Sequence, residues 1–287
     1  MAVELINTPF YPQTKYQCGP AALATLLEFH GVETTLDDLS RQIYIPGRKG
    51  SLQIEVIAAA RRHEMLPYTL EPNMLDIFTE VAAGNPVLVL QNLSFEWYPQ
   101  WHYAVVVGYD IDRQEITLRS GTTRRWTTPF KVFERTWQRA KFWALAMVPV
   151  GEIPKTAKPL PYLKTVYAFE ETGHPELALK AYRSASRRWP DVVDTWLTLG
   201  NMLLHTQDWS EAVQAFSTAT RLEPKSSTGW NNLAYALHGY GCADQAKQAL
   251  QCGLKTAPDD ENLLDSWQEL STPSVNSNHA ECPVVQC

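Results

Sequence analysis

Residues 196–224 read WLTLGNMLLHTQDWSEAVQAFSTATRLEP, and the pattern in this stretch recurs on either side of it. Four kinds of residue return with one fixed period of 34 over three copies, which predicts a structural repeat. Small side chains allow two helices to approach closely, large ones fill the space between units, and proline ends the second helix of each unit. The four columns are Tyr162, Trp196 and Trp230; Ala178, Ala212 and Ala246; Tyr182, Phe216 and Leu250; and Pro190, Pro224 and Pro258.

The period and the order of these residues resemble the tetratricopeptide repeat. We expect three repeats, at 159–192, 193–226 and 227–260, and a capping helix at 261–270 that covers the last apolar face. The resemblance implies an all-α tetratricopeptide repeat solenoid over 162–270, which offers a surface to a peptide or a partner protein. Packing on the first domain or self-association is the alternative use of that surface.

The composition of the chain agrees with two globular domains. It has 287 residues, 45% of them hydrophobic and 20% charged, which excludes a largely disordered or fibrous chain. No apolar run approaches the ~18 residues of a membrane-spanning helix, so we expect no transmembrane segment. The net charge of −6 divides into −1 for residues 1–150 and −5 for residues 151–287. Neither half has the basic footprint of a protein that binds nucleic acid.

Residues 150–161 (VGEIPKTAKPLP) separate the two domains. We expect a first domain at 1–150, a semi-rigid linker at 151–161 and a polar, disordered end at 271–287. The N-terminus shows no signal peptide, and the sequence leaves localisation open between the cytoplasm, as the chain is written, and the periplasm or envelope, if a signal was removed.

Five cysteines occur at scattered positions, and the count is odd. This pattern predicts neither a disulfide framework nor a zinc site. We expect Cys242 and Cys252 to be structural, whereas Cys282 and Cys287 fall in the polar end. Cys18 stands alone in the first 241 residues and is either a buried core residue or a reactive thiol.

The first domain is predicted to be α+β, with helices first and antiparallel strands later. Helices are expected at 19–30, at 36–43 after a cap at Thr34 or Thr35, and at 51–64 with Ser51 as the cap. A buried strand is expected at 87–91, a hairpin from 102–109 and 115–119, and a last strand within 142–150.

Cys18 lies at the start of the first expected helix and is followed by Gly19 and Pro20. The free N–H groups and the positive end of the helix dipole stabilise a thiolate at this position. A base would have to come from one of three histidines. His30 and His63 end helices, whereas His102 opens the strongly apolar strand WHYAVVVG (101–108), where an imidazole needs a partner. A hydrogen-bonded strand histidine without a catalytic role is the alternative.

The segments PQTKYQCGPAALATLL (12–27) and WHYAVVVGYD (101–110) resemble the papain-like cysteine peptidases that process the double-glycine leader peptides of bacteriocins. The resemblance covers about residues 4–149 and implies a papain-like fold for this domain. It implies Cys18 as the nucleophile, His102 as the base and Gln13 as the oxyanion donor. Gln17 competes with Gln13 for that last role.

The third catalytic position departs from the family, which places Asp or Asn on the following strand. Asp110 lies eight residues along the strand from His102, ~26 Å away, and is better explained as a turn residue. Hairpin pairing brings His102 opposite residues 120–123, so Ser120 occupies the acid's place. A hydroxyl stabilises imidazolium less than a carboxylate does, which predicts slower turnover or a catalytic dyad. The aromatic segment 94–101 either walls the substrate cleft or packs over a small core.

We therefore expect a bacterial cysteine peptidase that cleaves a peptide or protein substrate through a thiolate–imidazolium pair of Cys18 and His102, without a metal or another cofactor. Its repeats recruit the substrate or a protein partner. The alternative is a catalytically weak or inactive peptidase-like adaptor that binds proteins through its repeats. Bacteriocin exporters fuse the peptidase to a membrane ATPase, but no G-x-x-x-x-G-K-[ST] loop occurs in this sequence.

Overall fold

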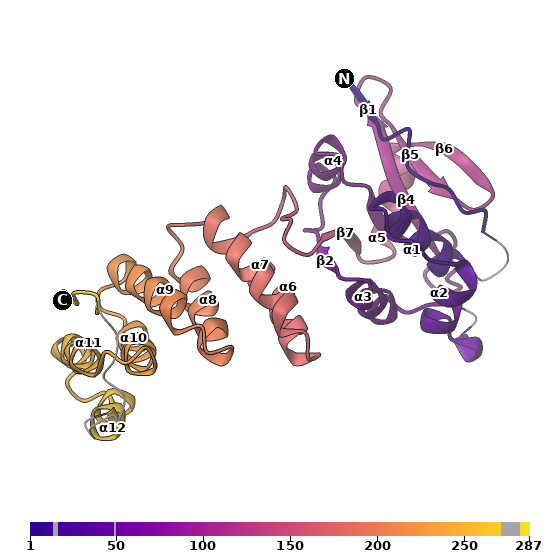
Figure 1. The fold of residues 1–287 in the computed structure, drawn as a ribbon. Helices are drawn as coiled ribbons and strands as arrows, with labels where there is room; N and C mark the ends of the chain where they lie inside the picture. The colour runs from indigo at the N-terminus through magenta and orange to yellow at the C-terminus, as the bar shows by residue number, and fades with distance from the viewer. Residues whose placement is uncertain (14–16, 49, 271–281) are drawn as a thin grey trace. The chain divides into compact units, whose positions relative to one another are not determined.

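A computed structural model describes residues 1–13, 17–48, 50–270 and 282–287. It divides into two compact units, Met1–Lys158 and Pro159–Cys287, shown in Figure 1. Among the described residues, no helix combines the length and the apolar character needed to cross a membrane.

The first unit is α+β. Its N-terminal half contains β1 (Ala2–Glu4), α1 (Cys18–Phe29), α2 (Leu36–Ile43), a 3₁₀ turn (Pro46–Arg48), α3 (Gln53–Arg62), β2 (Met65–Thr69) and α4 (Met74–Ala82). Its second half contains β3 (Val87–Asn92), β4 (Trp101–Asp110), β5 (Glu115–Ser120), β6 (Thr123–Pro129), α5 (Phe130–Gln138) and β7 (Ala144–Pro149).

The strands form one antiparallel sheet in the order β2-β7-β3-β4-β5-β6, with β1 paired to β4. The expected hairpin is confirmed as β4–β5, where Tyr109 pairs with Ile116 and Asp110 with Glu115. The Asp110 carboxylate accepts the N–H groups of Asp112 and Arg113 at 3.0 and 3.2 Å, so it is a turn residue as predicted.

Side chains on the two faces of the sheet pack against different helices. On one face, buried residues of α1, α2 and α3 form a core with strand residues such as Leu88, Tyr103 and Val105. On the other, α5 buries Phe133 and Trp137 completely, and its Thr136 accepts a hydrogen bond from Gln91 of β3. Strand alternation explains why neighbouring residues of β3 serve both layers.

Several local predictions can be compared with these elements. Thr35 is the N-cap of α2, where its side chain accepts the N–H of Asp38. The expected Ser51 cap is wrong: α3 begins at Gln53, and its N-cap is Leu52, which makes no side-chain cap bond. Helix α6 begins at Pro159, inside the stretch expected to be linker, because proline is well tolerated in a first helical turn. The elements β1, β2, α4, β6 and α5 were not predicted.

The second unit is entirely helical, with α6 (Pro159–Glu171), α7 (Pro175–Arg188), α8 (Val193–His205), α9 (Trp209–Leu222), α10 (Ser227–Gly239), α11 (Ala243–Thr256) and α12 (Glu261–Leu270). Each member of the alanine column is completely inaccessible, and the column of Tyr182, Phe216 and Leu250 is buried as the spacing predicts. In the first column Tyr162 and Trp230 are buried, whereas Trp196 is half-buried. A Cβ atom on Gly200 would lie 2.6 Å from the ring of Phe216, so this close helix pair requires glycine. The indole N–H groups of Trp196 and Trp230 each donate to the carbonyl of the proline six residues earlier, at 2.8 Å.

Four cysteines are paired in this unit, which corrects the prediction from the sequence. Cys242 bonds to Cys282 and Cys252 to Cys287, whereas Cys18 is free. The expectation of a free C-terminal end is therefore wrong for residues 282–287, and its other part, 271–281, lies outside the described residues. Sequence separations of 40 and 35 residues gave no sign of the pairing, because it depends on where α11 meets the chain end.

Candidate active site

Cys18 is the first residue of α1, the position predicted from the Cys-Gly-Pro sequence. Its side chain is partly buried against the core under the sheet. Burial raises the pKa of the Cys18 thiol, and the backbone N–H groups of Tyr103, Gly19 and Cys18 itself lower it in part. Tyr103, one of the residues that lower this pKa, follows His102 directly in β4.

Two residues outside the expected site hold the start of α1 in place. A Cβ atom on Gly19 would lie 2.5 Å from the Ser51 hydroxyl oxygen, so the helix can approach Ser51 only with glycine here. The phenol of Tyr103 donates to the Ser51 carbonyl at 3.3 Å. The sequence indicated Ser51 only as a helix cap and not as a neighbour of Gly19, whereas a buried tyrosine beside the candidate histidine could have indicated the role of Tyr103.

His102 is the second residue of β4, and its partner is the predicted one. Its Nε2 atom lies 2.8 Å from the Ser120 hydroxyl at the end of β5. Burial lowers the pKa of the imidazole. Cys18 and His102, both among the described residues, make no hydrogen bond to each other. Nε2 is occupied by Ser120, which leaves Nδ1 as the nitrogen available to a thiol.

Gln13 reaches the same region from the N-terminal segment. Its backbone N–H donates to the Gly121 carbonyl at 2.9 Å, and its Oε1 atom accepts the Gly121 N–H at 3.1 Å. Its Nε2 atom donates to the Tyr103 carbonyl at 3.4 Å. Gln13 is therefore fixed between the Tyr103 backbone and the residue after Ser120. Gln17, the competing amide, is the N-cap residue of α1 and forms no side-chain cap bond.

Arg119 supports this arrangement and was missed in the sequence, where it looks like one of many surface cations. It is only 4% exposed and donates to the carbonyls of Ile6, Thr8 and Arg124. These bonds attach the N-terminal segment to β5 and β6 just before Ser120. Burial lowers the pKa of Arg119.

The aromatic side chains before His102 do not pack over a small core, and that alternative is wrong. Phe95, Trp97, Tyr98 and Trp101 are all more than half exposed, with Trp97 reaching 81%. Their loop is closed by buried Asn92, whose side-chain Oδ1 atom accepts the backbone N–H groups of Ser94 and Gln100. The loop therefore presents aromatic rings to solvent immediately before His102.

The described residues contain no group of three His, Cys, Asp or Glu side chains that could hold a metal ion. What the geometry assembles is a thiol, an imidazole held by a hydroxyl, and amide groups around the Tyr103 backbone. These are the components of nucleophilic acyl transfer.

Comparison with known proteins agrees with this geometry. Residues 5–145 match the model of the Peptidase_C39 like family, and residues 163–227 match the tetratricopeptide repeat. The first unit is a C39-like peptidase domain. Tetratricopeptide repeats follow it in the second unit. No curated protein matches the chain.

Similar solved structures correspond to one unit or the other. A putative C39-like peptidase from Bacillus anthracis has 18% identity and a TM-score of 0.44, covering 54% of this chain and 100% of its own. A double glycine motif protease from an AMS/PCAT transporter, in complex with the leader peptide, has 21% identity and a TM-score of 0.39, covering 49% and 91%. The second TPR domain of human RPAP3, in complex with an HSP70 peptide, has 17% identity and a TM-score of 0.38, covering 40% and 97%.

Proposed function

We propose that this C39-like domain is a bacterial cysteine peptidase that cleaves a peptide or protein substrate, and that the repeats recruit the substrate or a partner. The observation that carries the proposal is the His102 imidazole, whose Nε2 atom lies 2.8 Å from the Ser120 hydroxyl, in a domain where Cys18 is the first residue of α1. The proposed roles are Cys18 as nucleophile, His102 as base, Gln13 as oxyanion donor and Ser120 as the residue that orients the imidazole.

The first chemical step moves one proton and forms one bond. In the tautomer that we assign to His102, Nε2–H donates to Ser120 across the 2.8 Å contact, so Nδ1 accepts the proton of the Cys18 thiol as the sulfur attacks the substrate carbonyl. The tetrahedral intermediate then collapses, and the imidazolium returns this proton to the leaving amine. Water hydrolyses the remaining thioester with the same imidazole as the base.

The oxyanion of the intermediate requires hydrogen-bond donors. The backbone N–H of Cys18 at the start of α1 is one, and the helix dipole adds to its effect. The Gln13 amide is the second. One of its N–H groups is directed to the Tyr103 carbonyl, and the other remains for the oxyanion.

One observation favours the second candidate, a weakly catalytic or inactive adaptor. Burial raises the pKa of the Cys18 thiol and lowers that of the His102 imidazole, so both groups favour their neutral forms. Ser120 supplies no negative charge against imidazolium. The two candidates therefore differ in the reactivity of Cys18.

Alkylation with iodoacetamide at neutral pH measures this reactivity. Cys18 is the free cysteine among the five, so the oxidised protein should take up one label. A peptidase site predicts that Cys18 reacts faster than a small free thiol, and that His102→Ala removes the excess. A rate no faster than the free thiol, together with intact biological activity in Cys18→Ala, would eliminate the peptidase proposal and leave the adaptor.

A further inference from the structure

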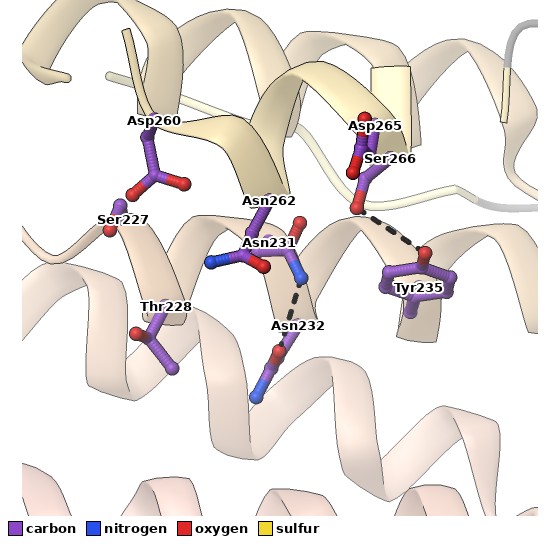
Figure 2. Close-up of a pocket in the computed structure, with 9 residues that line it drawn as sticks. All are labelled: Ser227, Thr228, Asn231, Asn232, Tyr235, Asp260, Asn262, Asp265 and Ser266. Carbon is purple, nitrogen blue, oxygen red and sulfur yellow. Dashed lines mark hydrogen bonds between the residues drawn. The ribbon is translucent and has the colours of Figure 1, made fainter. Parts of the chain in front are cut away.

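The second unit has a polar pocket between α10 and α12 that the proposed chemistry does not use (Figure 2). Its volume is about 360 Å³. Its walls are formed by hydroxyl, amide and carboxylate side chains, and none of these residues is basic. The lining residues are Ser227, Thr228, Asn231, Asn232, Tyr235, Asp260, Asn262, Asp265 and Ser266.

The asparagine side chains of α10 that line the pocket donate hydrogen bonds to other asparagines. The Asn231 amide donates to the Asn232 side chain at 3.5 Å, and the Asn232 amide donates to Asn201 of α8 at 2.9 Å. At the end of this series the Asn231 Oδ1 atom is buried and has no hydrogen-bond partner. In Figure 2 Asn231 lies between Asn232 and Asn262 of the facing helix. A buried acceptor without a partner requires a donor from a ligand or water.

Three hydroxyl groups of the pocket also donate their protons to neighbouring protein residues. Ser266 donates to the Tyr235 phenol at 3.3 Å, and that phenol donates to Glu269 at 2.6 Å. Ser227 donates to Asp260, and this bond is the largest of the causes that lower the pKa of that carboxyl. These three hydroxyl protons are thus used within the wall.

The acceptors of the pocket include two carboxylates, those of Asp260 and Asp265. Asp260 also accepts the backbone N–H of Leu263 at 3.2 Å, in the first turn of α12. Asp265 is exposed one turn further along and forms no ion pair within the described chain. A ligand that suits this pocket brings several donors and a positive charge, because the unpaired Asn231 oxygen and the exposed Asp265 carboxylate are both acceptors. Lysine and arginine side chains both fit this description, and arginine fits better because its planar guanidinium has five N–H donors and can reach both acceptors at once.

We infer that this pocket binds an arginine side chain of a peptide or protein partner. The inference rests on the recruiting role proposed above for the repeats and is independent of the cysteine chemistry. Asp265 pairs with the guanidinium charge, and the buried Asn231 oxygen accepts one of its N–H groups.

The test is fluorescence anisotropy with the full chain carrying Cys18→Ala, so that no peptide is cleaved. Three labelled Gly/Ser octapeptides carry two arginines, two citrullines or two glutamates. Citrulline keeps the shape of arginine and removes its charge. We expect the arginine peptide to bind about 10-fold more tightly than the citrulline peptide, as expected for charge-assisted hydrogen bonds.

Variants separate this pocket from the general acidity of the unit. Asp265→Asn and Asn231→Leu should each weaken arginine-peptide binding about 5- to 10-fold. Asp191→Asn removes the same charge at an exposed position outside the pocket and should leave binding unchanged. Thermal unfolding curves matching the parent protein confirm that each variant is folded.

The outcomes distinguish the pocket from the recruiting role. Equal binding of the citrulline or glutamate peptide overturns the arginine pocket and leaves recruitment standing. An equal loss in Asp191→Asn and Asp265→Asn also overturns it, because diffuse charge then explains the binding. No binding of any peptide contradicts both the pocket and peptide recruitment by the repeats, whereas peptidase activity is tested separately by Cys18 alkylation.

Discussion

Replacement of Ser120 by aspartate would test the electrostatics of the candidate site most directly. The Ser120 oxygen already lies 2.8 Å from Nε2 of His102, so a carboxylate at this position would accept the same N–H. The charge would oppose the burial that now lowers the pKa of His102. Thiolate and imidazolium would then form together at neutral pH.

The size of the expected pKa shift of His102 follows from its distance to position 120 and from the burial of the two side chains. An opposite charge within about 4–6 Å shifts a pKa by roughly 1–3 units, and each unit corresponds to about 1.4 kcal/mol. His102 and Ser120 are only partly buried, so we take the lower part of this range. An increase of about 1–2 units raises the population of the ion pair roughly 10- to 100-fold, with an equal gain in Cys18 alkylation near neutral pH.

The assay is the second-order rate of iodoacetamide alkylation of Cys18 as a function of pH. In the parent protein we expect the rate to rise toward alkaline pH, because burial raises the pKa of the thiol. Ser120→Asp should shift this rise to lower pH. Ser120→Asn is the control, since it matches the size of aspartate without its charge. Equal profiles for the two variants would refute the electrostatic role of position 120.

Three further predictions concern packing and covalent structure. Gly19→Ala would place a Cβ atom 2.5 Å from the Ser51 hydroxyl oxygen, so alkylation of Cys18 should slow and the free energy of unfolding should fall by about 1–3 kcal/mol. The double variant Gly19→Ala/Ser51→Gly should restore both, and a double variant as impaired as the single one would contradict this contact. Gly200→Ala would place a Cβ 2.6 Å from the Phe216 ring and should lower the free energy of unfolding of the repeats by about 1–3 kcal/mol in urea titrations, whereas Gly229→Ala, with its nearest atom at 3.3 Å, should cost less. The two disulfides join cysteines 40 and 35 residues apart, and each constrains the unfolded chain by up to about 4 kcal/mol. Their reduction should lower the urea midpoint of the repeats and leave that of the peptidase domain unchanged, whereas an unchanged repeat midpoint would show that the bonds add no stability.

The repeats were predictable because their fold depends on a periodic pattern. Ala212 and Phe216 occupy columns whose spacing alone identifies two facing helices, and both are completely buried. The disulfides were not predictable, because Cys242 and Cys282 are 40 residues apart in the sequence and belong to no spaced cysteine motif. Sequence spacing alone does not tell which distant thiols meet in the fold.

The candidate site likewise has a part that local sequence rules could predict and a part that they could not. The position of Cys18 follows from a local rule about helix starts, and that of Ser120 from counting residues around the Asp110 turn. The contacts of Ser51 and Gln13 depend on packing between segments distant in sequence. Local rules therefore predicted which residues matter, whereas the positions of their supports required the fold.

Arg119 shows why the N-terminal segment belongs to this candidate site. A buried guanidinium is costly unless its N–H groups are satisfied, and here they are satisfied by the carbonyls of Ile6, Thr8 and Arg124. Gln13 and Ser120 therefore depend on the same anchor, one through the N-terminal segment and the other through β5. The proposed oxyanion donor and the residue proposed to orient the imidazole are thus connected twice, through this buried side chain and through the hydrogen bonds of Gln13 to Gly121.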